Sequence, residues 1–300
     1  MKNWFFKPSS IHLLMVLSVF FVIPALWLQG TDLKPWYPSS LQVNGEVDYR
    51  FQYYPCVDAP HCQPHYSSTD HFLEGSLLFV FDPLSVQMEG EWADTKKRSF
   101  DWDHVSLTAR YLWLDDNLGD SVSLTTGVTL SRAWREAVND ISSFHHGRNE
   151  LFLHAALGKQ SLQEAFWKTR WWGVIGIGTA DRWTPWIVAN ANYEWNSLSA
   201  HRLNLYVNSL WGCGSKKINI CRFGGYGPVD HRSIDIGLKY TYVFDYCGYL
   251  SFEYARRVYA HNFPDQANQF KISYIYPFGP EGDYFLLKAY SLFFDTPSFL

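Results

Sequence analysis

The residues from Leu41 to Tyr53 alternate without a break between apolar and polar side chains. A period of two places one kind of side chain on each face of a β-strand. Soluble strands average about five or six residues, whereas a tilted strand needs about 9–11 residues to cross the hydrocarbon core of a membrane. The length of this alternation therefore favours a membrane barrel over a soluble sandwich.

The same alternation returns along most of the chain. Thirteen segments can be read if Tyr284 to Phe294 is one of them, and single-chain bacterial barrels use even strand numbers. We therefore expect an all-β, antiparallel transmembrane barrel of about twelve strands, with 14 as the upper count. Beside 41–53, clear segments lie at 84–92, 104–113, 187–195, 234–244 and 269–276, and weaker ones near 73–81, 121–131, 149–159, 167–179, 201–210 and 248–258.

Connection lengths and aromatic residues give the barrel an orientation. Short turns such as 82–83, 115–120 and 245–248 take turns with longer stretches at 55–71, 94–102, 132–148, 211–231 and 259–266. Barrels with short periplasmic turns and longer external loops show this asymmetry. Aromatic pairs end the strands that run toward the short turns, and we predict that they form an interfacial girdle. These pairs are Phe79 and Phe81, Tyr111 and Trp113, Tyr193 and Trp195, Tyr242 and Phe244, and Tyr274 and Tyr276.

In these features the chain resembles the outer-membrane β-barrel proteins of Gram-negative bacteria, over about residues 41–294. The resemblance is one of architecture, and it implies an outer-membrane location and contact with membrane lipids. Composition excludes other classes. The 55 aromatic residues could not stay solvated in a disordered chain, and a net charge of −4 without a basic run argues against nucleic-acid binding.

Residues 1–30 have the layout of a secretory signal peptide. Lys2 and Lys7 precede the apolar run from Ile11 to Leu28, and no acid lies among them. An uncleaved anchor is the alternative, because the run is close to the length of a membrane span. Residues 31–300 are then expected to form a single barrel domain.

The polar faces of the strands predict a charged lumen. Strand parity gives nearly equal numbers of inward acids and bases, which fits either a weakly selective channel or a closed interior cross-linked by ion pairs. The predicted pore-lining residues are Glu46, Asp48, Arg50, Glu89, Glu91, Arg110, Lys239, Glu253 and Arg257.

The cysteines fall in loops or turns. Cys56 with Cys62, and Cys213 with Cys221, are candidates for two disulfides on the external side, which leaves Cys247 over. Reduced thiols are the alternative. The first loop also carries histidines, but its six-residue step between cysteines does not match structural zinc spacing, so we predict no metal and no cofactor.

A weak set of catalytic candidates lies where the loop after residue 131 enters the next strand: Ser143, His145, His146 and Glu150. A nucleophile needs a base within about 3 Å and a third group that orients the base. The stretch is similar to the His-x-Ser element of a lipid A deacylase. It departs from that element because Gly147 and Arg148 follow His146.

Three functions follow from these features, in order. The first is a narrow porin-like channel for small polar solutes. The second is a closed barrel that serves as a structural or surface-interaction protein. The third is a lipid A or phospholipid hydrolase at the rim. Basic residues of the second and third external loops form a solvated loop face or, as the alternative, meet phosphates of a surface glycolipid; they are Lys96, Lys97, Arg98, Arg132 and Arg135.

Overall fold

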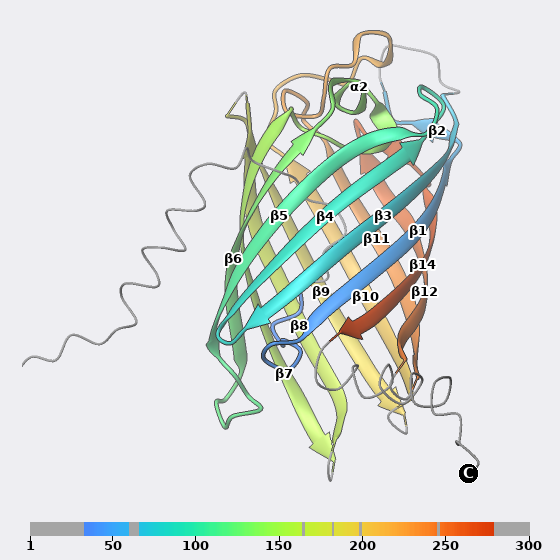
Figure 1. Cartoon of the computed structure of the whole chain (residues 1–300). Coiled ribbons are helices and arrows are strands. Elements are labelled where there is room, and N and C mark those ends of the chain that lie inside the picture. The colour runs from blue at the N-terminus through green and yellow to red at the C-terminus, as the bar shows by residue number, and fades with distance from the viewer. Residues whose placement is uncertain are drawn as a thin grey trace, which may run out of the picture.

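The computed structural model describes residues 33–59, 66–163, 166–181, 183–197, 200–244 and 247–278. Twelve antiparallel strands form a closed barrel, because β1 pairs with β3 on one side and with β14 on the other (Figure 1). Among the described helices, none has the length and apolar character needed to cross a membrane. The strands are β1 (Val43–Tyr54), β3 (Ser68–Phe81), β4 (Leu84–Asp94), β5 (Asp101–Leu114), β6 (Ser123–Ala133), β7 (Asn149–Gln163), β8 (Phe166–Ala180), β9 (Pro185–Ser197), β10 (His201–Gly212), β11 (Arg232–Phe244), β12 (Gly248–His261) and β14 (Asn268–Phe278).

The outer face of the barrel is apolar and the inner face is polar, as a lipid environment requires. Large apolar side chains point outward and are exposed, as in Ile175 (62%) and Val47 (58%). Polar side chains such as Gln87, Thr108 and Ser273 point inward and are buried. In water this arrangement would leave a continuous apolar belt unburied, whereas in a bilayer the belt meets acyl chains. The expected transmembrane barrel of twelve strands is confirmed.

The ends of the barrel also match the predicted asymmetry. The turn from β3 to β4 is 82–83, whereas the loops from β6 to β7 and from β10 to β11 span 134–148 and 213–231. At the short-turn end, the side chains of Phe81, Trp113 and Trp195 are exposed, as an aromatic girdle requires. The predicted signal peptide and the segment 284–294 lie outside the described residues.

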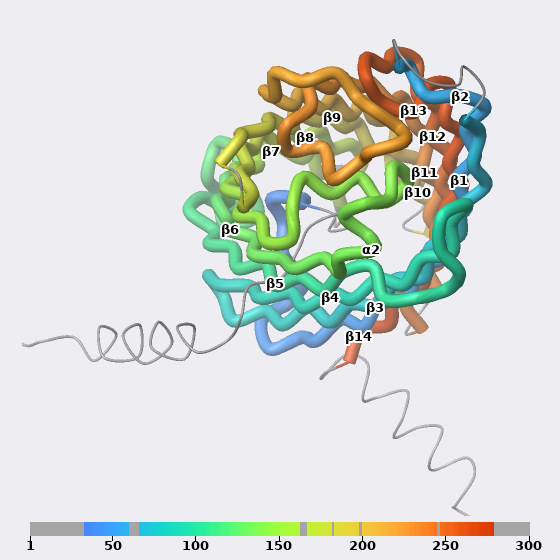
Figure 2. The backbone as a smooth tube through the Cα atoms, turned by 90° about the horizontal axis from the view of Figure 1, so that it is seen from above, coloured from blue at the N-terminus to red at the C-terminus, as the bar shows by residue number. Residues whose placement is uncertain are grey.

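The two long loops fold into the external mouth of the barrel (Figure 2). We call residues 134–148 and 213–231 together the plug. The first loop contains α2 (Arg135–Val138) and the 3-10 turn η1 (Ile141–Ser143), and the second contains the 3-10 turn η2 (Ile220–Arg222). A two-stranded sheet of β2 (Cys56–Val57) and β13 (Pro264–Asp265) lies beside them.

A second segment enters the barrel near its opposite end. Residues 33–38, here called the N-terminal strap, lie inside the ring of strands (Figure 2). Trp36 donates a hydrogen bond from Nε1 to Asp116 Oδ1 at 2.7 Å and meets the ring of Trp172 edge-on. Leu33 packs against Phe152 and Trp172. The lumen is therefore narrowed from both ends.

Candidate functional site

The lumen between the plug and the N-terminal strap contains a cavity of about 360 Å³. Phe144, His145 and His146 of the plug line its external side, and Leu33 of the strap reaches its other end. Strand residues of both charges line the wall between them. Four asparagines from β9 and β10 add amide groups to one side; they are Asn190, Asn192, Asn204 and Asn208.

Most of the predicted pore-lining residues meet at this cavity. Seven of the nine line it: Glu46, Asp48, Arg50, Glu91, Lys239, Glu253 and Arg257. The other two, Glu89 and Arg110, point inward but lie elsewhere. Glu89 Oε1 lies 3.5 Å from His104 Nε2, and Arg110 donates to the carbonyl oxygen of Lys34 in the strap at 3.1 Å.

Ion pairs join charged side chains of different strands of the lumen wall. Arg50 on β1 donates to Glu91 on β4 at 2.9 Å. On the opposite side of β1, Asp48 lies 2.6 Å from the ammonium of Lys271 on β14. Arg257 on β12 binds the carboxylate of Asp235 on β11 with two nitrogens, at 2.7 and 2.9 Å. Buried charges require partners, because burial of an unpaired ion costs roughly several kcal/mol of folding free energy.

The cavity is more acidic than strand parity alone predicted. Among the described residues, seven acids and four bases line it. Two of the acids, Glu74 on β3 and Glu150 on β7, come from the weaker alternating segments and were missed. The signal that could have found them is strand parity, because Glu74 follows the outward Leu73 and Glu150 precedes the outward Leu151.

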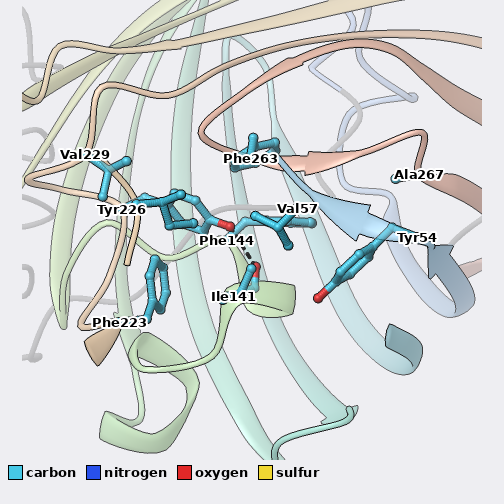
Figure 3. Close-up of a cluster of buried hydrophobic side chains, with 10 residues drawn as sticks. Tyr54, Val57, Ile141, Phe144, Phe223, Tyr226, Val229, Phe263 and Ala267 are labelled. Carbon is cyan, nitrogen blue, oxygen red and sulfur yellow. Dashed lines mark hydrogen bonds between the residues drawn. The ribbon is translucent and has the colours of Figure 1, made fainter. Parts of the chain in front are cut away.

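An aromatic core holds the plug in place (Figure 3). Tyr226 is fully buried, and its hydroxyl donates to the carbonyl oxygen of Ile141 at 3.0 Å, which links the two loops of the plug. The ring of Phe263 lies 4.8 Å from that of Tyr226 and 4.9 Å from that of Phe144. Backbone bonds strengthen the link, since the amides of Tyr226 and Gly227 donate to the carbonyls of His145 and His146.

The candidate catalytic residues do not form a nucleophile–base pair. Ser143 Oγ accepts a hydrogen bond from Arg98 at 3.0 Å. His145 Nε2 lies 2.6 Å from Asp103 Oδ2 on β5. The ring of His146 lies between Glu150, 3.2 Å from its Nδ1, and His231, 3.2 Å from its Nε2. These contacts are those of groups that fasten the plug to the wall and to itself.

Burial keeps the histidines of the plug neutral. Desolvation lowers the pKa of His145, although Asp103 opposes this shift, and it lowers the pKa of His146 well below the usual range. Burial also lowers the pKa of His231 to about 4, although the carbonyl of Val229 favours the charged form. Protonation of these groups is therefore unfavourable while the plug is in place.

The cysteine pairings remain predictions. Cys56 and Cys213 are free thiols in this structure. Cys62 lies outside the described residues.

The basic side chains of the external loops do not all point toward the outer surface. The side chain of Arg98 is 9% exposed and binds the carboxylate of Asp103, so it does not face a surface glycolipid. Lys96 and Lys97 donate to the carbonyl oxygens of Ser67 and Asn139. Glycolipid binding remains a prediction for Arg132 and Arg135, whose side chains are exposed.

Comparison with known proteins identifies the fold. No protein-family model matches the sequence, and no curated protein matches it. An outer-membrane channel from Pseudomonas putida F1 is similar in structure, with a TM-score of 0.60, 13% identity, and coverage of 84% of this chain and 100% of that channel. The KdgM porin is 12% identical, with a TM-score of 0.47 over 78% of this chain and 99% of its own. The NanC porin is 9% identical, with a TM-score of 0.48 over 77% of this chain and 98% of that porin.

The likeness to the Pseudomonas channel and the apolar exterior agree on the architecture. The chain has the fold of outer-membrane β-barrels, and this fold belongs in the outer membrane, where the exposed belt contacts lipid.

Proposed function

We propose that this protein is a narrow, gated outer-membrane channel for small polar solutes, with a preference for cations. The observation that carries the proposal is the cavity of about 360 Å³ between the plug and the N-terminal strap, which seven acids and four bases line among the described residues. A barrel with a purely structural role has no need of such a polar chamber, and a chamber lined with charges holds water.

The structure supports a closed state of this channel. The wall of the barrel is a continuous ladder of strand pairs, whereas the plug consists of loops held by side chains and a few backbone bonds. Opening therefore requires displacement of the plug and the N-terminal strap, without any change in strand pairing. Loops of this kind move on timescales that strand ladders do not share.

The test is conductance of the purified, detergent-folded full chain in a planar bilayer. Under a salt gradient, we expect discrete steps whose reversal potential shows that cations pass preferentially. The double variant Glu46→Gln/Glu253→Gln removes two cavity carboxylates and should shift the reversal potential toward zero. Glu136→Gln, an exposed plug residue, is the matched control and should leave the potential unchanged.

A closed barrel used as a structural or surface-interaction protein is the second candidate. The aromatic core of the plug favours it, because buried side chains hold the two loops of the plug together at the external mouth. The two functions differ in one measurement. A variant with a loosened plug conducts if the protein is a gated channel, whereas silence from folded wild-type and loosened protein alike would favour the second candidate and reject the channel.

A further inference from the structure

A β-bulge gives β5 an unusual pair of inward side chains. Glu91 on β4 pairs with His104, and the next residue, Trp92, pairs with Trp102, so Asp103 is the extra residue of the bulge. In a regular strand, consecutive side chains point to opposite faces. Here both Asp103 and His104 are fully buried inside the barrel. Bulges commonly re-aim side chains in this manner next to functional sites.

The plug brings a third side chain that can bind a metal ion to the bulge. His145 is buried, and its Nε2 lies 2.6 Å from Asp103 Oδ2, while His104 Nδ1 lies 3.0 Å from the same oxygen. One ligand atom from each of the three residues lies within 4.8 Å of the others. A tetrahedral zinc site with bonds of about 2.1 Å puts its ligand atoms about 3.4 Å apart, so small side-chain rotations would bring all three onto one ion.

A fourth ligand and the local charge also suit a dication. Glu91 Oε1 lies 3.8 Å from His104 Nδ1, while Arg50 binds the other oxygen of Glu91. Glu89 Oε1 lies 3.5 Å from His104 Nε2. Asp103, Glu89 and Glu91 thus surround His104 with three carboxylates, against the guanidinium groups of Arg98 and Arg50. Three carboxylates around one buried imidazole favour a cation at this place.

We propose that Asp103, His104 and His145, with Glu91 completing the set, form a binding site for a divalent transition metal of the zinc class. A donor set of imidazole nitrogens and carboxylate oxygens suits zinc better than it suits calcium or magnesium. Because His145 belongs to the plug and the other ligands to the wall, the metal fastens the plug to β5. Metal binding itself stands apart from the proposed channel function, and only its effect on opening rests on that function.

The test is zinc binding by the purified full chain, refolded in detergent after chelation. Titration with Zn²⁺ alone, followed by calorimetry and by metal analysis after gel filtration, should give one ion per chain. Co²⁺ should then show the visible absorption of a tetrahedral site, and Zn²⁺ should displace it. His145→Gln keeps a donor toward Asp103 but lacks the imidazole, and we expect its affinity to fall about tenfold or more.

Matched controls separate the cluster from other ligands on the chain. His201→Ala removes a histidine near the short-turn end, and Asp101→Asn removes an exposed carboxylate two residues from Asp103. Both should bind zinc as the wild type does. Each variant is checked for folding by its circular dichroism. Absence of stoichiometric binding by folded wild type, or equal binding by folded His145→Gln, would overturn the site.

The effect on opening is measured separately. In a planar bilayer, Zn²⁺ should lower the opening frequency of the wild type and leave that of His145→Gln unchanged. If zinc binds with one ion per chain but the protein never conducts under any condition, the metal site stands and the channel function fails. Conductance without zinc binding would support the channel function and reject the metal site.

Discussion

His146 Nε2 lies 3.2 Å from His231 Nε2, and this contact joins the two loops of the plug inside the barrel. His231 donates from Nδ1 to the carbonyl oxygen of Val229 at 2.9 Å, so its Nε2 accepts and His146 donates. The ring of His146 also stacks on Trp186 of the wall, with ring centroids 3.8 Å apart. The plug is therefore held by neutral imidazoles in an aromatic setting.

Acid is expected to loosen the plug. The groups around His231 are His146, Tyr226 and Asp230, and burial lowers the pKa of His231 to about 4. With the plug displaced, the pKa of His231 returns to about 6.5. The displaced state then binds more protons between these values, so closure weakens as the pH falls from about 6.5 to 4, by about 3 kcal/mol.

Opening frequency in a planar bilayer, measured from pH 7.5 to pH 4, checks this expectation. The wild type should open more often as the pH falls. His231→Gln should show a flatter response, while His201→Gln at an exposed position should behave as the wild type does. A wild type whose opening does not change with pH would contradict the role of His231.

Truncation of Tyr226 should open the channel without unfolding the barrel. Tyr226→Ala leaves a cavity in the aromatic core of the plug, at a cost of about 3–5 kcal/mol to closure. Tyr226→Phe removes only the hydrogen bond to Ile141, at about 1 kcal/mol. Opening frequency should therefore rise strongly in the first variant and slightly in the second, with circular dichroism unchanged. The reverse order would show that the hydrogen bond, rather than packing, closes the plug.

Loss of Lys271 should destabilise the barrel wall. Its ammonium lies 2.6 Å from Asp48, whose side chain is 2% exposed. Lys271→Met leaves a buried carboxylate unpaired, and we expect the free energy of unfolding to fall by about 3–5 kcal/mol. Asp48→Asn/Lys271→Met should recover most of this loss. Urea titration followed by tryptophan fluorescence measures both.

The exposed pair of Arg232 and Asp230 provides the comparison. These side chains are 49% and 35% exposed and lie 3.4 Å apart. Arg232→Met should change the free energy of unfolding by less than about 1 kcal/mol, because water screens the pair. Equal effects of Arg232→Met and Lys271→Met would mean that burial of the Asp48 pair contributes nothing.

The N-terminal strap should limit conductance once the plug is displaced. Trp36→Ala removes the hydrogen bond to Asp116 and the contact with Trp172. By itself it should leave the channel closed, because the plug still seals the external mouth. Combined with Tyr226→Ala, it should raise the unit conductance above that of Tyr226→Ala. Trp183→Ala, at a side chain that is 80% exposed, is the control and should add nothing.

The strand pattern was available in the sequence because it depends on local alternation and on the thickness of a bilayer. Between Leu41 and Tyr53 the apolar residues occupy the outward face and the polar ones the lumen face, so parity alone placed Glu46, Asp48 and Arg50 inside the barrel. The girdle at Trp113 and Trp195 followed from the same rule. Strand number was less certain because the segment 284–294 also alternates.

Parity misled where the backbone departs from a regular strand. Asp103 occupies an outward position by counting from Val105, and only the bulge opposite Glu91 turns it inward. Sequence reasoning therefore missed the cluster with His104 and His145. Register shifts depend on pairing with a neighbouring strand, which no local pattern records.

The sequence by itself determined a membrane barrel, predicted to have about twelve strands, with a polar lumen and an apolar belt, because the two faces follow from a two-residue period and the strand length from a fixed membrane thickness. Only the tertiary structure decided that two long loops fold into the external mouth of the barrel (Figure 2). His145, His146 and Tyr226 lie in loops that read as polar or irregular sequence, and their burial depends on contacts with residues more than eighty positions away, such as the bond from Tyr226 to Ile141. Long-range packing of loops has no periodic signature, so it appears only when the chain has folded.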